Sequence, residues 1–96
     1  MKITDCKIKL IENGAQLKGI ANVSLDNEFL VRDIKIVEGK EGLFIAMPSR
    51  KVNDNEFRDI AHPINSESRN ELQEAILKAY EEAKIKAAEV ENEVHV

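Results

Sequence analysis

The sequence contains a single cysteine, few aromatic residues and no long hydrophobic run. Its single cysteine, Cys6, cannot form an internal disulfide, which is typical of a protein in a reducing compartment. The chain has no run of about 18 apolar residues, and no apolar run follows Lys2. We therefore expect no signal peptide, no membrane span and no membrane partner, and we predict a cytoplasmic protein.

The length of 96 residues predicts one domain. A domain of this size buries about 60 to 70% of its unfolded surface, which suffices for a packed sheet and helix but leaves no deep catalytic cleft. His62 and His95 have no cysteine or carboxylate at zinc-ligand spacing, and no motif supports a triad of Cys6, His62 and Asp59. We predict no enzymatic activity, no metal, no cofactor and no small-molecule substrate. His62 is expected to form a structural hydrogen bond between neighbouring elements, and Cys6 to be a small apolar strand residue.

The net charge of −4 is unevenly distributed along the chain. Residues 1–60 contain ten Lys/Arg and ten Asp/Glu, whereas residues 61–96 contain four and eight. An acidic balance normally argues against nucleic-acid binding, because phosphates repel a negatively charged protein. A local basic loop in the neutral part can still bind, provided that the acidic C-terminal part points away and the ligand contacts few phosphates.

Hydrophobic alternation predicts three strands in the first part of the chain, at residues 3–11, 17–25 and 29–37. Turn-forming residues separate these strands at 12–14, which reads Glu-Asn-Gly, and at 26–27, which reads Asp-Asn. The second strand has one mostly apolar and one mostly polar face. The third strand has apolar residues on both faces: Leu30, Ile34 and Ile36 on one, and Phe29, Val31 and Val37 on the other.

This two-sided third strand is the main argument from the residues for a homodimer. A small sheet against one helix buries one face, so further apolar residues on the opposite face must meet a second layer or another subunit. The alternative is that the strand is buried at one end between the helix and a hairpin. Composition does not decide between the two.

The rest of the chain is expected to form a β-hairpin and a helix. Residues 43–47 predict a short apolar strand that Pro48 ends, and residues 56–60 its return strand, with a basic loop between them. Asn65 or Ser66 can cap the following helix. The apolar stripe of that helix consists of Leu72, Ile76, Tyr80, Ala83 and Ala87.

The predicted fold class is therefore α+β: an antiparallel sheet, made of a three-stranded meander plus a β-hairpin, packed with a C-terminal helix. Beyond Tyr80 the apolar stripe thins to alanine. Residues 81–96 are interpreted as an acidic helical extension, a frayed tail or a surface for a partner helix.

Arg50 and Lys51, followed by Arg58, place cationic side chains on the loop of the predicted hairpin, an arrangement suited to phosphates or to an acidic partner. An isolated Arg-Lys pair is more often a solvated turn. Phe44 and Phe57 could stack on unpaired bases. Because the chain has only three Phe and one Tyr, however, we first expect these side chains in the core.

Three stretches of the chain resemble the SpoVG family, small bacterial proteins also called septation regulators: Asp26-Asn-Glu-Phe29, Gly42-Leu-Phe-Ile-Ala-Met-Pro-Ser-Arg-Lys51 and Glu56-Phe-Arg-Asp-Ile-Ala-His-Pro-Ile-Asn-Ser66. The resemblance covers residues 1–80 and leaves 81–96 outside. It implies a homodimer in which an antiparallel sheet packs on a C-terminal helix, and site-specific binding of DNA, with RNA binding in some members. The family's roles include control of septation at sporulation, and of capsule, virulence or cell-division genes.

The resemblance places the nucleic-acid contacts on the basic pair after Met-Pro-Ser, here Arg50 and Lys51, with Ser49 and Arg58 as further candidates. One departure lies in the hairpin turn, where relatives usually have Asp-Gly-Glu and this chain has Asp-Asn-Glu at 54–56. Because Asn tolerates positive φ better than other non-glycine residues, we expect the turn to form.

Two functions from different classes are compatible with these residues. The first is a dimeric nucleic-acid-binding regulator, in which two-fold pairing places two basic loops on one side and raises their effective concentration. The second is a protein-interaction adaptor of the division or septation machinery, which offers a sheet edge or the acidic helix to a partner. Substitutions at Arg50 and Lys51 should impair the first function, and substitutions along residues 81–93 the second.

Overall fold

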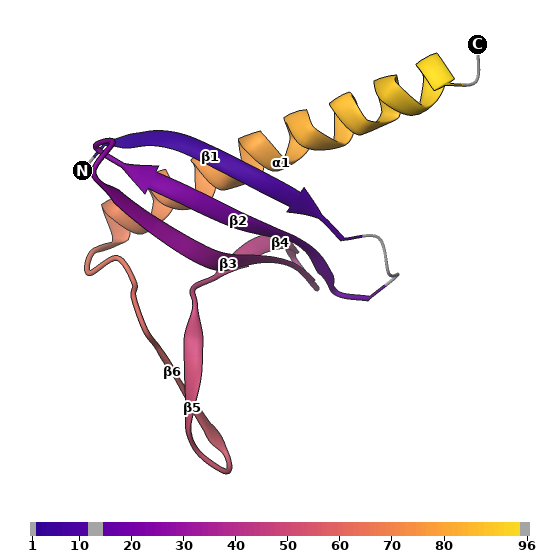
Figure 1. Cartoon of the computed structure of the whole chain (residues 1–96). Coiled ribbons are helices and arrows are strands. Elements are labelled where there is room, and N and C mark those ends of the chain that lie inside the picture. The colour runs from indigo at the N-terminus through magenta and orange to yellow at the C-terminus, as the bar shows by residue number, and fades with distance from the viewer. Residues whose placement is uncertain (1, 12–14, 95–96) are drawn as a thin grey trace.

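The chain forms a sheet, a separate hairpin and one long helix, and the computed structural model describes residues 2–11 and 15–94 (Figure 1). The turn expected at 12–14 lies outside the described residues. In chain order the elements are β1 (Ile3–Leu10), β2 (Leu17–Leu25), β3 (Phe29–Gly39), β4 (Gly42–Ala46), β5 (Ser49–Asn53), β6 (Glu56–Asp59) and α1 (Ser66–Val94).

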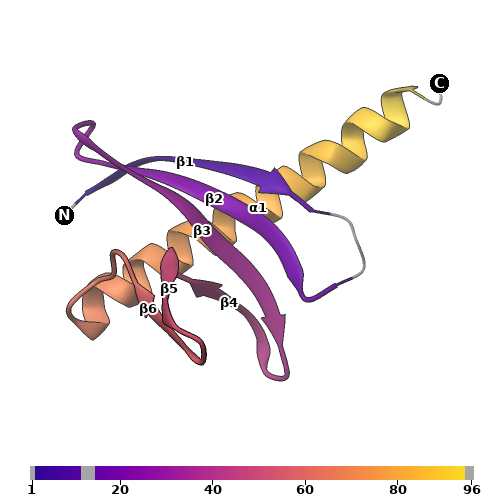
Figure 2. The same cartoon turned by 60° about the horizontal axis from the view of Figure 1, so that its bottom comes forward.

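Strands β1 to β4 form one antiparallel sheet in which each strand pairs with the next along the chain. Helix α1 lies across one face of this sheet and contacts β1, β2 and β4 (Figures 1 and 2). Strands β5 and β6 pair only with each other and form the hairpin. The α+β class predicted from the sequence is confirmed.

Strand β4 extends the meander, contrary to the pairing expected from the sequence. We expected residues 43–47 to pair with 56–60, but β4 pairs along its whole length with β3. The cause is a tight turn between Gly39 and Gly42, in which Gly42 has a φ of 122°, a conformation that L side chains rarely adopt. The turn brings the chain straight back onto β3. The sheet therefore has four strands, and the basic stretch that we expected to be a loop is itself strand β5.

A β-bulge interrupts the alternation of side chains in β3. Val31 and Ile34 pair with residues of β2 that are two positions apart, so Arg32 and Asp33 together lie opposite Asn22. Asp33 has a φ of 62°, in the left-handed region that Asp adopts more readily than most residues. Its N–H donates to Oδ1 of Asn22 at 3.1 Å. A side chain of the neighbouring strand thus satisfies a backbone donor at the bulge.

The bulge also explains the two-sided hydrophobic pattern of this strand. Because it adds one residue, Phe29 and Val31 lie on the same face as Ile34. All three line a pocket together with Leu72 of α1, so they point toward the helix. The assignment of Phe29 and Val31 to the opposite face was therefore wrong, and the pattern of β3 does not by itself require a second layer.

The core is a single layer between the sheet and the helix. Leu72, Ile76 and Tyr80 repeat at four-residue intervals and form the predicted stripe. Gly19 lies beneath Tyr80, where a Cβ would stand 3.6 Å from ring atom Cδ1 and 3.1 Å from the carbonyl oxygen of Lys9. The missing side chain lets the ring close on the sheet. The buried residues are Ala21, Val23, Ile34, Ile36, Ile45, Met47, Leu72, Ile76 and Tyr80.

Helix α1 begins at a side-chain cap formed by Asn65. Its Oδ1 accepts a hydrogen bond from the N–H of Ser68 at 2.7 Å, and its carbonyl oxygen accepts one from the N–H of Arg69 at 3.2 Å. Of the two predicted capping residues, Asn65 and Ser66, the structure selects Asn65. The cap satisfies a backbone donor of the first turn and fixes where the connection from the hairpin ends.

Two side chains of α1 cover the outer edge of β4. Nη2 of Arg69 donates to the carbonyl oxygen of Ile45 at 3.2 Å, and the N–H of Ile45 donates to Oε1 of Gln73 at 3.5 Å. Exposed backbone groups on an edge strand invite pairing with another chain. These hydrogen bonds therefore protect β4 from edge-to-edge association at its centre.

The helix continues beyond the sheet (Figure 1). After Tyr80 its inward side consists of half-buried Ala83 and Ala87, whereas Ile85 is 57% exposed. As far as Ala88, the continuation thus has little apolar surface to bury against this chain. Among the residues described, no helix is both long enough and apolar enough to cross a membrane.

We predict that Asn65→Ala lowers the free energy of unfolding by about 1 kcal/mol, because the Ser68 N–H loses its acceptor. Asn65→Asp keeps an acceptor and should behave like the wild type. Asn70→Ala is the matched control, since Asn70 is exposed within the same helix and alanine is the better helix former there. Urea denaturation followed by circular dichroism measures all three variants. Equal stability of Asn65→Ala and Asn70→Ala would contradict the assignment of the cap.

Candidate functional site

The β5–β6 hairpin stands away from the sheet and helix (Figure 1). Every residue of both strands is exposed. Two-stranded ribbons of this kind are at best marginally stable by themselves in water, because they have no apolar face to bury. The shape of the hairpin must therefore come from its anchor to the domain and from contacts within it.

The anchor lies at the base of the hairpin. The N–H of Ile60 donates to the carbonyl oxygen of Pro48 at 2.7 Å, which closes the base. Beside this bond Met47 is buried in the core, and Ala61 and Pro63 are half-buried. Met47, Ala61 and Pro63 line an apolar cavity of about 180 Å³ between the sheet and the start of α1. Both ends of the hairpin are thus fixed to the edge of the core.

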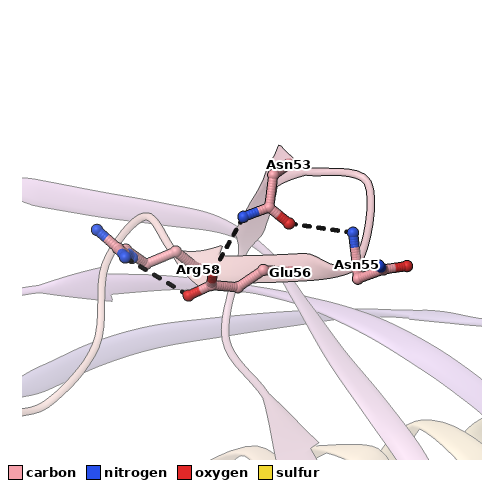
Figure 3. A network of polar contacts seen from close by, with 4 residues as sticks. All are labelled: Asn53, Asn55, Glu56 and Arg58. Atoms are coloured by element: carbon pink, nitrogen blue, oxygen red, sulfur yellow. Dashed lines mark hydrogen bonds and ion pairs between the residues drawn. The ribbon is translucent and has the colours of Figure 1, made fainter.

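A polar network holds the hairpin turn (Figure 3). Oδ1 of Asn53 accepts a hydrogen bond from the N–H of Asn55 at 3.1 Å, and Nδ2 of Asn53 donates to Oε2 of Glu56 at 3.1 Å. The other oxygen of Glu56 forms an ion pair with Nη2 of Arg58 at 3.5 Å. The turn forms as predicted, but not through a positive φ at Asn55. Among the non-glycine residues described, positive φ occurs at Asp26, Asn27 and Asp33.

The two faces of the hairpin carry different chemistry. Residues directly opposite each other on antiparallel strands point to the same side. Arg50 lies opposite Arg58, so one face presents two guanidinium groups. Lys51 lies opposite Phe57, and these two residues form the other face together with the next pair, Ser49 and Asp59.

The hairpin has no net charge, but two of its three cations form no ion pair in the part of the chain that the structure describes. Across residues 49–60 the three cations Arg50, Lys51 and Arg58 are balanced by Asp54, Glu56 and Asp59. Glu56 is engaged by Arg58, whereas neither Arg50 nor Lys51 forms an ion pair within the part of the chain that the structure describes. One hairpin therefore offers available cations but no net positive charge.

The structure places all four candidate residues, Ser49, Arg50, Lys51 and Arg58, on this one hairpin. What the sequence interpretation missed is Phe57, which we assigned to the core and which is 68% exposed. A signal for this exposure was present: Phe57 lies between two charged residues in a strand with no other apolar residue before Ile60.

Two further candidates have structural roles. Nδ1 of His62 lies 2.9 Å from the carbonyl oxygen of Pro63, so its contact is with the next residue and does not bridge the hairpin and the helix as expected. Cys6 packs against the core from β1. Its burial, and to a smaller extent the charge of Asp5, raises the pKa of the Cys6 thiol from the ordinary 9.0 to about 11. The thiol is thus neutral at physiological pH, unlike a reactive thiolate.

Comparison with known proteins assigns this arrangement to a family. The model of the SpoVG family matches residues 1–82. The chain belongs to the SpoVG family. It is 57% identical over 84 residues to a protein of Caldanaerobacter subterraneus subsp. tengcongensis, covering 88% of this chain and 92% of that one. It is 60% identical over 83 residues to a protein of Clostridium beijerinckii, covering 86% and 91%. Both relatives bear the name "Putative septation protein SpoVG".

The SpoVG match spans the whole sheet, the hairpin and the helix as far as Glu82. The helix beyond residue 82 lies outside it. The resemblance read from three stretches of sequence is therefore confirmed.

The pKa of Cys6 predicts how stability depends on pH. Because the folded pKa lies above the unfolded value, the folded state holds the thiol proton more tightly. This contribution is complete below about pH 9 and is lost as the pH rises through about 11. Between pH 8 and pH 11 the urea midpoint of the wild type should fall further than that of Cys6→Ala, which lacks only the thiol. Parallel decreases would contradict the burial of the thiol.

Proposed function

We propose that this protein is a cytoplasmic nucleic-acid-binding regulator that acts in septation and binds through the β5–β6 hairpin, without catalysing a reaction. Duplex DNA is the first expected ligand and RNA the second. The observation that carries the proposal is the pair of exposed arginines, Arg50 and Arg58, directly opposite each other on a ribbon that stands away from the sheet. The names of the relatives support the septation role.

The dimensions and chemistry of the hairpin suit a duplex. The major groove of DNA is about 12 Å wide and admits a two-stranded β-ribbon. An arginine can bind two phosphate oxygens, or O6 and N7 of guanine. The face with Arg50 and Arg58 would lie toward the DNA.

The opposed arginines also cost stability in the absence of a ligand. Like charges on directly opposite residues of a sheet destabilise the pair by a few tenths to about 1 kcal/mol. Glu56 offsets the charge of Arg58 in part, since their ion pair is exposed and therefore weak. A phosphate between the guanidinium groups would relieve the repulsion. Phosphate binding would therefore recover the stability that the free hairpin loses to this repulsion.

We further propose that two copies of the chain pair, because one neutral hairpin is a weak ligand for an anion. Two linked hairpins raise each other's effective concentration at neighbouring sites on the nucleic acid. Phe29 lines the cavity at the base of the hairpin and is 65% exposed, and Ile64, which follows the lining residue Pro63 along the chain, is 90% exposed. Exposed large apolar side chains of this kind are typical of an interface between proteins.

A second candidate function is a protein-interaction adaptor. It is favoured by the extension of α1 past the sheet, where Ile85 is exposed among charged residues beyond the family match. An amphipathic helix with an accessible apolar position can bind in the groove of a partner. The two functions use separate surfaces, so the same experiments distinguish them.

The hairpin proposal predicts that the double variant Arg50→Ala, Arg58→Ala binds labelled duplex DNA at least about tenfold more weakly than the wild type. The dependence of affinity on salt should also become shallower, by about one unit of log–log slope for each phosphate that the variant no longer binds. Fluorescence anisotropy at several salt concentrations measures both quantities.

The control for this experiment is the double variant Lys7→Ala, Lys9→Ala, which removes the same net charge from exposed positions on β1. It should keep nearly the wild-type affinity and slope. Equal binding by the hairpin variant and the control would remove the hairpin as the site. Absence of wild-type binding to every DNA and RNA pool would favour the adaptor.

The proposed pairing predicts that Ile64→Asp converts a dimer into a monomer, because the charge would be desolvated in the interface. Sedimentation velocity measures the change. Ile85→Asp is the control, since it introduces the same charge at another exposed isoleucine and should leave the dimer intact. A monomeric wild type, or a dimer that survives Ile64→Asp, would contradict the proposed interface.

A further inference from the structure

The hairpin face that carries Phe57 has no assigned role when the opposite face binds a duplex. Phe57 is directly opposite Lys51 on this face, and Ser49 and Asp59 form the neighbouring pair. The arginines lie on the other side of the ribbon. An aromatic ring and a lysine therefore form a surface that is distinct from the arginine pair and separated from it by the thickness of one ribbon.

The exposure of Phe57 is not explained by packing within the chain. The core and the side chains that pack against it come from the sheet, the helix and Met47, whereas both hairpin strands are wholly exposed. Phe29, by comparison, is exposed at the rim of an apolar cavity and faces α1. Phe57 stands on a ribbon with Lys51, Ser49 and Asp59 as its neighbours on that face, and it presents its ring to solvent.

We propose that Phe57 and Lys51 form a site for an unpaired nucleotide, in which the base stacks on the Phe57 ring and Lys51 binds the adjacent phosphate. The inference rests on the proposed nucleic-acid binding and extends it to single strands. Proteins that bind single strands combine an aromatic surface for the base with a cation for the backbone. The direct pairing of Lys51 with Phe57 supplies both at adjacent positions on one face.

The remaining residues of this face orient the strand. Asp59 follows Phe57 by two residues and therefore lies on the same side, toward the base of the hairpin. Its carboxylate repels phosphate, so the backbone of a bound strand would pass over Lys51 on the β5 side. Ser49, opposite Asp59, has a hydroxyl that can hydrogen-bond to a base edge or a sugar.

Base pairing decides which of the two faces a nucleic acid uses. In a duplex the flat surfaces of the bases are covered by their neighbours, and the Phe57 ring could reach one only by opening the stack. In a loop or single strand these surfaces are available. Phe57 is thus a residue that determines specificity for unpaired over paired nucleic acid, whereas Arg50 and Arg58 serve the duplex.

The chain contains no tryptophan, which allows a direct test of stacking. Phe57→Trp introduces a single indole at the site, and Ile60→Trp introduces one at a position of matched exposure, 67%, just beyond the end of β6. Each protein, with its dimer confirmed, is titrated with an oligothymidine strand, with a strand of the same length that carries abasic sites, and with a duplex. Tryptophan fluorescence is recorded.

The proposal predicts that oligothymidine quenches Phe57→Trp strongly, that the abasic strand quenches it weakly, and that neither quenches Ile60→Trp. In anisotropy assays Phe57→Leu should lose about 5- to 100-fold in affinity for the single strand and keep its duplex affinity within about twofold. Phe57→Tyr, which keeps a stacking ring, should bind like the wild type.

Equal quenching by the abasic strand and oligothymidine would overturn the stacking site, because the phosphates alone would then account for binding. Equal losses of single-strand and duplex affinity in Phe57→Leu would also overturn it and indicate a role in the shape or pairing of the hairpin. If the wild type bound duplex DNA but no single strand, this inference would fail while the proposed function stood. If it bound neither, both would fail.

Discussion

Burial of one face of the sheet against a single helix is the constraint on which the rest of the structure depends. The chain has one apolar stripe, Leu72 to Tyr80, and therefore one core layer. Met47 is the last residue of the central chain segment to enter this layer. The residues after it have no core to join, so they pair with each other and stand in solvent. The candidate site is a two-stranded ribbon because the core ends at Met47, just before the hairpin begins.

The same constraint makes the hairpin locally weak. Segments with few buried apolar contacts open at free energies well below that of global unfolding. The base is closed by the Ile60–Pro48 hydrogen bond and the turn by the contacts of Asn53 and Glu56, which partly compensate for the opposed arginines. A ribbon held at both ends but free along its length can adjust to a ligand. Local weakness and binding capacity therefore have one cause.

Much of the fold could be predicted from the sequence because it depends on local rules. The helical stripe follows from spacing, and the cap from Asn65 ahead of the first turn. The Asp26-Asn27 turn follows from residues that tolerate positive φ, and both have it, at 52° and 56°. Each of these features needs information from only a few neighbouring residues.

The errors concern features that depend on distant partners. The bulge at Asp33 needs the side chain of Asn22, eleven residues away, and it reverses the faces of the residues that precede it in the third strand. The pairing of β4 with β3 depends on the turn at Gly39–Gly42. From the sequence alone, pairing of residues 43–47 with 56–60 was an equally short alternative. Within the candidate site, the cations Arg50 and Lys51 could be identified from the sequence because they follow the Met-Pro-Ser motif. The exposure of Phe57 was missed, because composition predicts a core position and only the tertiary fold shows that no core lies beside it.

Binding of nucleic acid by the hairpin is tested by an NMR titration of the ¹⁵N-labelled protein with a short oligonucleotide. Chemical-shift changes should concentrate in the amides of residues 49–60, while those of the sheet and of the helix beyond Tyr80 remain largely unchanged. Changes that cluster on α1 or on the uncovered face of the sheet, with the hairpin amides unaffected, would contradict binding by the hairpin.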